Sequence, residues 1–262
     1  MNKKYKIVLM LLIVIFAISS YFFIKEIAEN KKENDLYEDL QEIMQNDEKL
    51  PNENDNTAIL NNEITNLSNK NTNNSYNLEN ITKINADTIG WIKINGTNIN
   101  YPVMQNGNYY LHRNIYKNYS SHGTPYLAEN CNLSTSDNLI IYGHHMNDNS
   151  MFSDLVNYKN YQFYRNHKYI NFYTLKDGQT IESTYEIVIA FKTVAYSNSG
   201  FKYHNYTNFY DEQELNSFVD NCRNLEVYNT GTRISYGDKL LTLSTCEYSQ
   251  KNGRMVIVSK KI

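Results

Sequence analysis

Many short β-like runs follow one another from about residue 88 to the C-terminus, and this pattern constrains the fold most. Turn signals such as Asn95-Gly96 and Asp177-Gly178 separate several runs. The runs show no regular alternation with helices, so the pattern favours a closed barrel or a sandwich over a parallel α/β sheet. The predicted strands are residues 88–94, 97–103, 138–142, 169–173, 184–196, 239–245 and 254–260.

One helix is marked by its first turn. Asp211 and Glu214 form a D-x-x-E start, which is related to the capping box. An apolar face follows at helical spacing, made by Leu215, Phe218, Val219, Cys222 and Leu225. We therefore expect a helix over residues 211–225, with Cys222 as a small buried core residue rather than a redox group.

The N-terminus predicts a membrane anchor. Residues 5–24 are apolar except for Lys6, and about 20 such residues let a helix cross the hydrocarbon core. Lys3 and Lys4 precede the run, which places the N-terminus in the cytoplasm and the remainder outside. A cleaved signal peptide also starts basic and turns apolar. The run is longer than a usual signal-peptide core and no clear cleavage site comes after it, so we favour an uncleaved single-pass anchor over residues 1–24.

Residues 25–80 differ in composition from the rest of the chain, with 13 acidic and 5 basic side chains. A helical stripe is made by Leu36, Leu40, Ile43 and Met44. Asn supplies 12 of the 30 residues from 51 to 80, which predicts a flexible spacer because too little apolar surface is present to offset the ordering entropy. The stripe either packs on the later domain or is solvated. Residues 81–262 then form one domain of ordinary size.

Charge and cysteine content exclude several function classes. The formal charge of −3 gives no reason to expect a nucleic-acid partner. No C-x-x-C or H-x-x-x-H pair occurs, so we expect no metal site and no cofactor. The three cysteines are an odd number, so at least one is unpaired; a disulfide between Cys131 and Cys222 stays open.

The terminal hairpin carries the first chemical signal. Alternation in residues 241–246 places Leu241, Leu243 and Thr245 on one face and Thr242, Ser244 and Cys246 on the other. Cys246 is therefore expected to point away from the core onto a polar surface. A hairpin that is symmetric about Gln250 sets Cys246 opposite Arg254, with their side chains on one face. A guanidinium beside a thiol favours the thiolate and stabilises a developing oxyanion.

A proton carrier is needed beside the thiol. His144 and His145 follow the apolar run NLIIYG, where Gly143 permits a sharp turn or a close backbone approach. The pattern does not decide between these two histidines. The other four histidines lie in polar or tyrosine-rich stretches without such a setting.

Together these segments resemble the sortase family. They are LTLSTC (241–246) with Arg254 downstream, IYGHHM (141–146) and IGWIKINGTNINYPVMQNGNYYL (89–111). MFSDL (151–155) and the helix at 211–225 resemble class B sortases. The resemblance covers residues 81–262 and implies an eight-stranded β-barrel with the active site in a groove on its outer wall.

The resemblance also implies roles for single residues. Cys246 matches the nucleophile, His144 the general acid/base and Arg254 the third catalytic residue. His145 occupies a position that varies in type and is expected to be a bystander. The family's substrate groove implies substrate-binding roles for the residues around the cysteine, with the Glu247 backbone N–H as an oxyanion donor: Ser244, Thr245 and Glu247.

The implied function is that of a membrane-anchored cysteine transpeptidase. It cleaves an NPxTN-like or PxTG-like sorting motif of secreted proteins after Thr, and transfers the acyl group to an amine of a peptidoglycan precursor or cross-bridge. A papain-like or cell-wall cysteine hydrolase places the Cys before the His, unlike this chain. A non-catalytic wall-binding protein would be favoured by a degenerate triad, and a pilin-polymerising sortase stays open.

Overall fold

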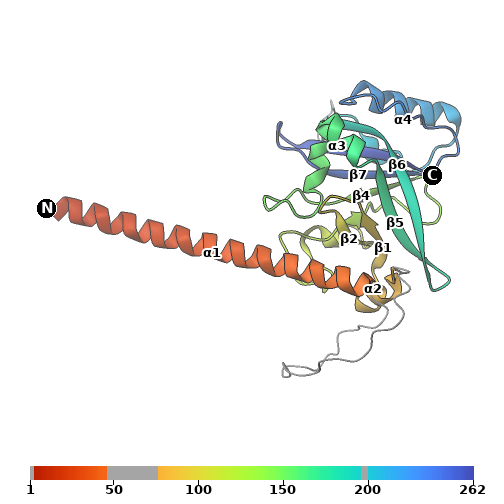
Figure 1. Ribbon diagram of the computed structural model, residues 1–262. Helices are drawn as coiled ribbons and strands as arrows, with labels where there is room; N and C mark the ends of the chain where they lie inside the picture. The colour runs from red at the N-terminus through yellow and green to blue at the C-terminus, as the bar shows by residue number, and fades with distance from the viewer. Residues whose placement is uncertain (1–2, 46–75, 196–199) are drawn as a thin grey trace. The chain divides into compact units, whose positions relative to one another are not determined.

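The computed structural model describes residues 3–45, 76–195 and 200–262 (Figure 1). The chain divides into two compact units, residues 1–39 and 40–262. Most of the predicted Asn-rich spacer lies outside the described residues. The predicted boundary at residue 24 falls within α1, and that at residue 80 within α2, so the predicted domain limits stay predictions.

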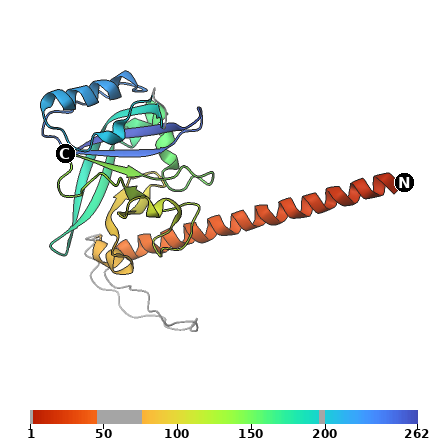
Figure 2. The same cartoon turned by 180° about the vertical axis from the view of Figure 1, so that it is seen from behind.

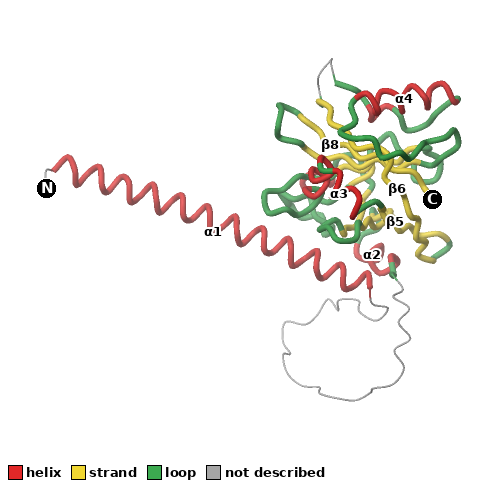
Figure 3. Tube along the Cα trace, turned by 45° about the horizontal axis from the view of Figure 1, so that its top comes forward, coloured by secondary structure: helices red, strands yellow, loops and turns green. Residues whose placement is uncertain are grey.

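Residues 88–261 form a closed eight-stranded barrel in the order β1-β2-β3-β4-β7-β8-β6-β5, which confirms the predicted fold. Two pairs, β2 with β3 and β4 with β7, are parallel, and the other pairs are antiparallel. Figure 3 shows the strands gathered together, with α4 beside them. The strands are β1 (Thr88–Lys93), β2 (Asn100–Met104), β3 (Tyr126–Leu127), β4 (Asn138–Tyr142), β5 (Tyr169–Lys176), β6 (Gln179–Val194), β7 (Leu240–Cys246) and β8 (Gly253–Lys261).

Seven of these strands overlap predicted runs, and β4 has the predicted bounds. β3 was not predicted, because two residues are too few to show an alternation. β6 begins five residues earlier than expected and forms a long hairpin with β5. Asp177 and Gly178 connect the two strands with φ of 53° and 76°, as a two-residue turn with both central residues at positive φ requires.

The described part of the chain also contains seven helical segments. The α-helices are α1 (Lys3–Gln45), α2 (Leu78–Ile84), α3 (Tyr161–Asn166) and α4 (Glu212–Asn224). Three 3-10 helices span Tyr109–His112, Ser153–Lys159 and Tyr203–Asn205.

Helix α4 begins as predicted, with a local difference in its cap. The Asp211 side chain accepts a hydrogen bond from the Glu214 N–H at 2.8 Å. The Glu214 carboxylate reaches back to the N–H of Tyr210 rather than to Asp211. Cys222 is fully buried, as expected, and burial raises the pKa of its thiol. Leu225, which was expected on the apolar face, is exposed because it forms the C-cap.

Helix α4 lies against β6 on the outside of the barrel (Figures 1 and 2). Its Phe218 ring contacts the rings of three residues of the connection from β6 to α4: Phe201, Tyr206 and Phe209. The helix therefore holds residues 200–211 against the barrel wall. There Tyr203 contacts Ser244 near the C-terminal end of β7.

Helix α1 is one continuous helix of 43 residues. Its N-terminal part is long and apolar enough to cross a membrane. The last turns belong to the second unit, where Leu40 and Met44 are buried. The Gln41 amide donates to the Asn100 carbonyl at 3.2 Å, so this end of the predicted stripe packs on the domain.

The connection between β7 and β8 is held by a buried carboxylate, Glu247. Lys159 and Lys192 lie 2.9 and 3.6 Å from its oxygens. The Ser249 hydroxyl donates to Glu247 at 2.5 Å. Burial opposes ionisation, but the bonds from Ser249 and Lys159 outweigh it and, with the lysine charges, lower the pKa of Glu247 to about 2.

Truncation should show where the folded domain begins. Leu78 and Ile81 are fully buried, and the Leu78 N–H donates to the Thr180 hydroxyl at 2.8 Å. A protein of residues 81–262 should therefore unfold with about 2–5 kcal/mol less stability than one of residues 76–262, the range for losing a large buried side chain. Urea denaturation measures the difference, and both proteins lack α1. Equal midpoints would contradict the packing of α2.

The Glu247 ion pairs predict a pH-dependent stability. Because its pKa is lower in the folded than in the unfolded protein, the stabilisation is complete above about pH 4.5 and is lost as the pH falls toward 2. Glu247→Gln should lower stability by about 1–3 kcal/mol at pH 7 and by little near pH 2. Denaturation across this range tests it, with the exposed Glu129→Gln as control. A pH-independent difference would contradict the account.

Candidate active site

A cavity of about 770 Å³ opens on the barrel wall, and all three predicted catalytic residues line it: His144, Cys246 and Arg254. Its walls come from the ends of β3, β4, β6 and β7, from residues 201–205 and from Leu111 and Thr124. Segments that are more than 100 residues apart in the sequence therefore meet in one groove.

Strand pairing sets Cys246 opposite Arg254, as the symmetric hairpin predicted. Cys246 is the last residue of β7 and is half-buried. Arg254 also pairs with Thr193 of β6, so it lies between two strands. One guanidinium nitrogen, Nη1, donates to the Gly253 carbonyl at 2.9 Å, which holds the guanidinium end of the side chain.

The polar face of β7 is more buried than the alternation predicted. Thr242 and Ser244 are almost inaccessible, and Ser244 is contacted by the connection from β6 to α4. The Tyr203 and Ser244 hydroxyls hydrogen-bond at 2.7 Å, and Thr242 donates to the Asn138 side chain at 2.8 Å. The expected open polar surface was wrong for these two residues; only the end of the strand, at Cys246, is accessible.

A glycine lets the chain bring His144 to the groove. A Cβ atom on Gly143 would lie 2.5 Å from the Phe152 ring, so only glycine allows this close approach. The Gly143 N–H donates to the Ser244 carbonyl at 3.2 Å, which extends the β4–β7 ladder by one bond. The next residue, His144, therefore emerges beside the end of β7.

The His144 ring is held by a backbone carbonyl. Its Nε2 lies 2.7 Å from the Leu111 oxygen, and because a carbonyl only accepts, Nε2 carries the proton. In the neutral ring this leaves Nδ1 as the nitrogen that can accept a proton. Burial lowers the pKa of His144, although the bond to Leu111 opposes the shift. Positive charge on three neighbours lowers it further: His112, His122 and Arg254.

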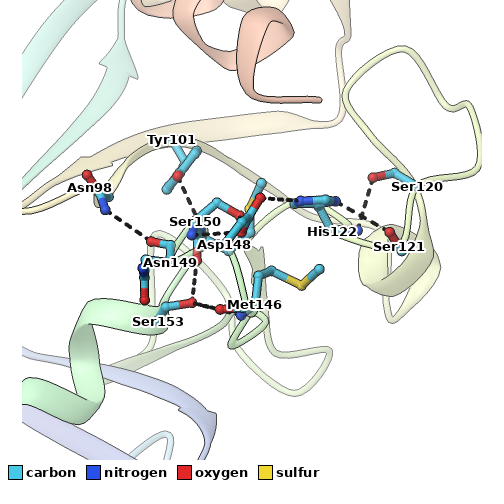
Figure 4. Close-up of polar contacts among 11 residues, drawn as sticks. Asn98, Tyr101, Ser120, Ser121, His122, Met146, Asp148, Asn149, Ser150 and Ser153 are labelled. Carbon is cyan, nitrogen blue, oxygen red and sulfur yellow. Dashed lines mark hydrogen bonds and ion pairs between the residues drawn. The ribbon is translucent and has the colours of Figure 1, made fainter. Parts of the chain in front are cut away.

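Two histidines without a local sequence signal lie close to His144. The ring of His112 stacks on that of His144, with centroids 5.5 Å apart and planes at 26°. His122 is fully buried, and its Nε2 lies 3.1 Å from the Asp148 carboxylate (Figure 4). Both belong to residues 109–124. No local sequence pattern predicts that this segment lies beside the groove.

The loop after His144 is closed by its own polar contacts (Figure 4). The Ser150 N–H and hydroxyl both donate to Asp148, at 3.0 and 2.6 Å. The Ser153 hydroxyl binds the N–H and the carbonyl of Met146. Asn149 and Met151 have φ of 64° and 56°, a left-handed conformation that Asn tolerates but that is uncommon for Met. These contacts hold the loop in that conformation.

The predicted substrate-binding residues divide into two groups. Ser244 and Thr245 line the cavity, with the Thr245 hydroxyl donating to the Gly143 carbonyl at 2.8 Å. Glu247 is not among the lining residues, and its buried side chain pairs with the more exposed Lys159 and Lys192. Its backbone N–H donates to the Gly253 carbonyl at 2.9 Å, and its role as an oxyanion donor stays a prediction.

Two expectations about the cysteines are settled. Cys131 and Cys222 are both free and buried, so they do not form a disulfide. Burial raises the pKa of each thiol, which keeps both in the unreactive thiol form. Cys246 is the one cysteine that lines the groove.

A thiol, an imidazole and a guanidinium in one groove can carry out acyl transfer. The thiolate is the nucleophile, the imidazole moves the proton, and the guanidinium stabilises the oxyanion. In such a reaction the acyl group passes through a thioester before a second nucleophile takes it.

Comparisons with known proteins agree with this chemistry. Residues 92–262 match the family model described as "Sortase domain". Sortase B of Staphylococcus aureus is 31% identical over all of this chain and 98% of its own length. A solved S. aureus sortase B–substrate complex has a TM-score of 0.68 at 29% identity, covering 90% of this chain and 98% of that one. Clostridium perfringens sortase B has a TM-score of 0.63 at 31% identity, covering 70% and 98%. The chain therefore belongs to the sortase family of cysteine transpeptidases.

Proposed function

We propose that this sortase is anchored in the cell membrane, cleaves a C-terminal sorting motif of secreted proteins after Thr, and transfers the acyl group to a cell-wall amine. The observation that carries the proposal is the groove in which Cys246, His144 and Arg254 meet. The likeness to sortase B proteins along the whole chain supports the class of substrate.

The reaction begins at Cys246. His144 takes the thiol proton of Cys246 on Nδ1, and the resulting thiolate attacks the carbonyl carbon of the motif's Thr. Arg254 binds the oxyanion of the tetrahedral intermediate. The C–N bond then breaks, with His144 giving a proton to the leaving amine, and a thioester remains on Cys246. The acceptor amine attacks the thioester carbonyl and loses a proton to His144. The C–S bond then breaks, the new amide leaves, and Cys246 takes the proton back from His144 as a thiol.

Cavity-lining residues support an extended peptide as the substrate. Tyr126 and Tyr142 of neighbouring strands place their rings 5.6 Å apart and both line the groove. Phe201 and Tyr203, in the connection from β6 to α4, also line the groove. Aromatic walls with a few polar groups suit short peptide side chains. A solved sortase B is described as complexed with triglycine, which supports a peptide amine as the acceptor here.

The decisive experiment measures both products of the reaction. Residues 76–262 are incubated with NPxTN-like or PxTG-like peptides and triglycine, and mass spectrometry identifies the cleavage site and the transfer product. Transfer after Thr supports the proposal. Cleavage without transfer would indicate a hydrolase, and transfer only to a protein lysine would indicate a pilin-polymerising enzyme.

Substitutions should separate the three roles. Cys246→Ala should abolish cleavage, and His144→Ala should lower turnover by about 100- to 10,000-fold because both proton transfers pass through it. Arg254→Lys keeps the charge but loses the planar fork of donors, so turnover should fall about 100- to 1,000-fold. Steady-state kinetics measures this. Near-normal turnover in Arg254→Lys would show that the arginine contributes only its positive charge and no directed hydrogen bonds to the oxyanion.

The anchor has its own test. Helix α1 is long and apolar enough to span a membrane, and three early lysines favour a cytoplasmic N-terminus. The full-length protein should fractionate with membranes, and protease added outside intact cells should digest residues 76–262. A mature secreted form that begins near residue 25 would contradict the anchor.

A further inference from the structure

The parallel pairing of β4 with β7 ends just before the catalytic residues. Tyr142 and Ser244 are the last paired residues, and the Gly143 N–H donates the last backbone bond. His144 and Cys246 both lie beyond this point. Their relative position therefore depends on whatever joins the two segments after the ladder stops.

Side chains continue the connection where the backbone ladder ends. The His145 Nδ1 lies 2.9 Å from the Cys246 carbonyl oxygen. In the reverse direction, the Tyr248 hydroxyl donates to the His145 carbonyl at 3.0 Å. The His145 and Tyr248 rings are in contact, with centroids 4.9 Å apart. Each of the two segments thus binds the other's backbone.

We propose that His145 is a positioning residue that, with Tyr248, fixes the spacing between His144 and Cys246. The pair, called here the His145–Tyr248 clasp, acts on both catalytic residues through the chain. Its His145 ring binds the carbonyl of Cys246, the proposed nucleophile. Its Tyr248 hydroxyl binds the carbonyl of His145, which directly follows His144, the proposed acid/base. This inference rests on the proposed roles of His144 and Cys246, and it replaces the expectation that His145 is a bystander.

The chemistry of the bond predicts how the clasp responds to pH. The Cys246 carbonyl only accepts, so Nδ1 of His145 carries a proton. Nδ1 bears a proton in the cationic ring as well, so the bond persists in either charge state. The bond from His145 to the Cys246 carbonyl therefore does not depend on the charge of the ring.

A set of substitutions separates positioning from folding and from proton transfer. His145→Ala removes the donor. His145→Asn keeps it, because the Asn amide nitrogen takes nearly the position of Nδ1. Tyr248→Phe removes the reciprocal bond alone. His167→Ala is the matched control, since its Nδ1 also lies on a backbone carbonyl, that of Phe163 at 2.8 Å, outside the groove.

Kinetics of each variant are measured with the peptide that the wild-type protein cleaves and with triglycine. His145→Ala should lower kcat about 10- to 100-fold, because a displacement near 1 Å costs up to that much, with KM changed less than about threefold. His145→Asn should recover most of kcat, and His167→Ala should match the wild type. Tyr248→Phe should lower kcat, and the double variant His145→Ala/Tyr248→Phe should lose less than the product of the single losses.

Three results would overturn the inference. The first is an unchanged kcat in His145→Ala. The second is an equal loss of kcat in His145→Asn and His145→Ala when both variants have the same unfolding midpoint as the wild type. The third is a shifted limb of the pH–rate profile in His145→Asn, which would make His145 a proton carrier. Failure of the proposed function is distinguishable, because Cys246→Ala would then retain activity or the wild type would show no transfer.

Discussion

The parallel pairing of β4 with β7 is the constraint on which the active site depends. It places Tyr142 beside Ser244, and so brings together segments that are about 100 residues apart in the sequence. The antiparallel pairing of β7 with β8 then sets Cys246 opposite Arg254. A slip of one residue in either register would turn the thiol or the guanidinium to the other face of the wall. The registers of β4 with β7 and of β7 with β8 together therefore fix the positions of the three residues that line the groove, His144, Cys246 and Arg254.

Polar contacts outside the ladder complete the site. The Leu111 carbonyl holds the His144 ring, and the buried pair of His122 and Asp148 joins residues 109–124 to the loop after His144. Burial then lowers the pKa of His144, so the neutral imidazole predominates. Directly after β7, Glu247 anchors the hairpin through Lys159 and Lys192 and does not line the cavity. These groups hold the side chains for which we propose catalytic roles.

Sequence reasoning succeeded where the signal is local. Alternation and turn residues located β4, the hairpin symmetry predicted the pairing of Cys246 with Arg254, and Gly143 marked a close approach. It failed where the cause is a distant segment. The burial of Ser244 depends on residues 200–211, which no pattern in β7 reveals. The positions of His112 and His122 beside His144, and the contacts of His145 with the β7–β8 connection, likewise arise from tertiary contacts. No local sequence pattern predicts such contacts.

Nitrogen NMR of the His144 ring tests the central claim most directly, because it needs no substrate. The claim is that the strand registers deliver His144 to the groove as a neutral imidazole held through Nε2. With ¹⁵N-labelled protein and His144→Ala for assignment, the account predicts a proton on Nε2 and none on Nδ1 at pH 7. It also predicts that the ring takes up its second proton at a pH below the usual range for histidine. A protonated Nδ1 at pH 7, in either the other tautomer or an imidazolium, would contradict it.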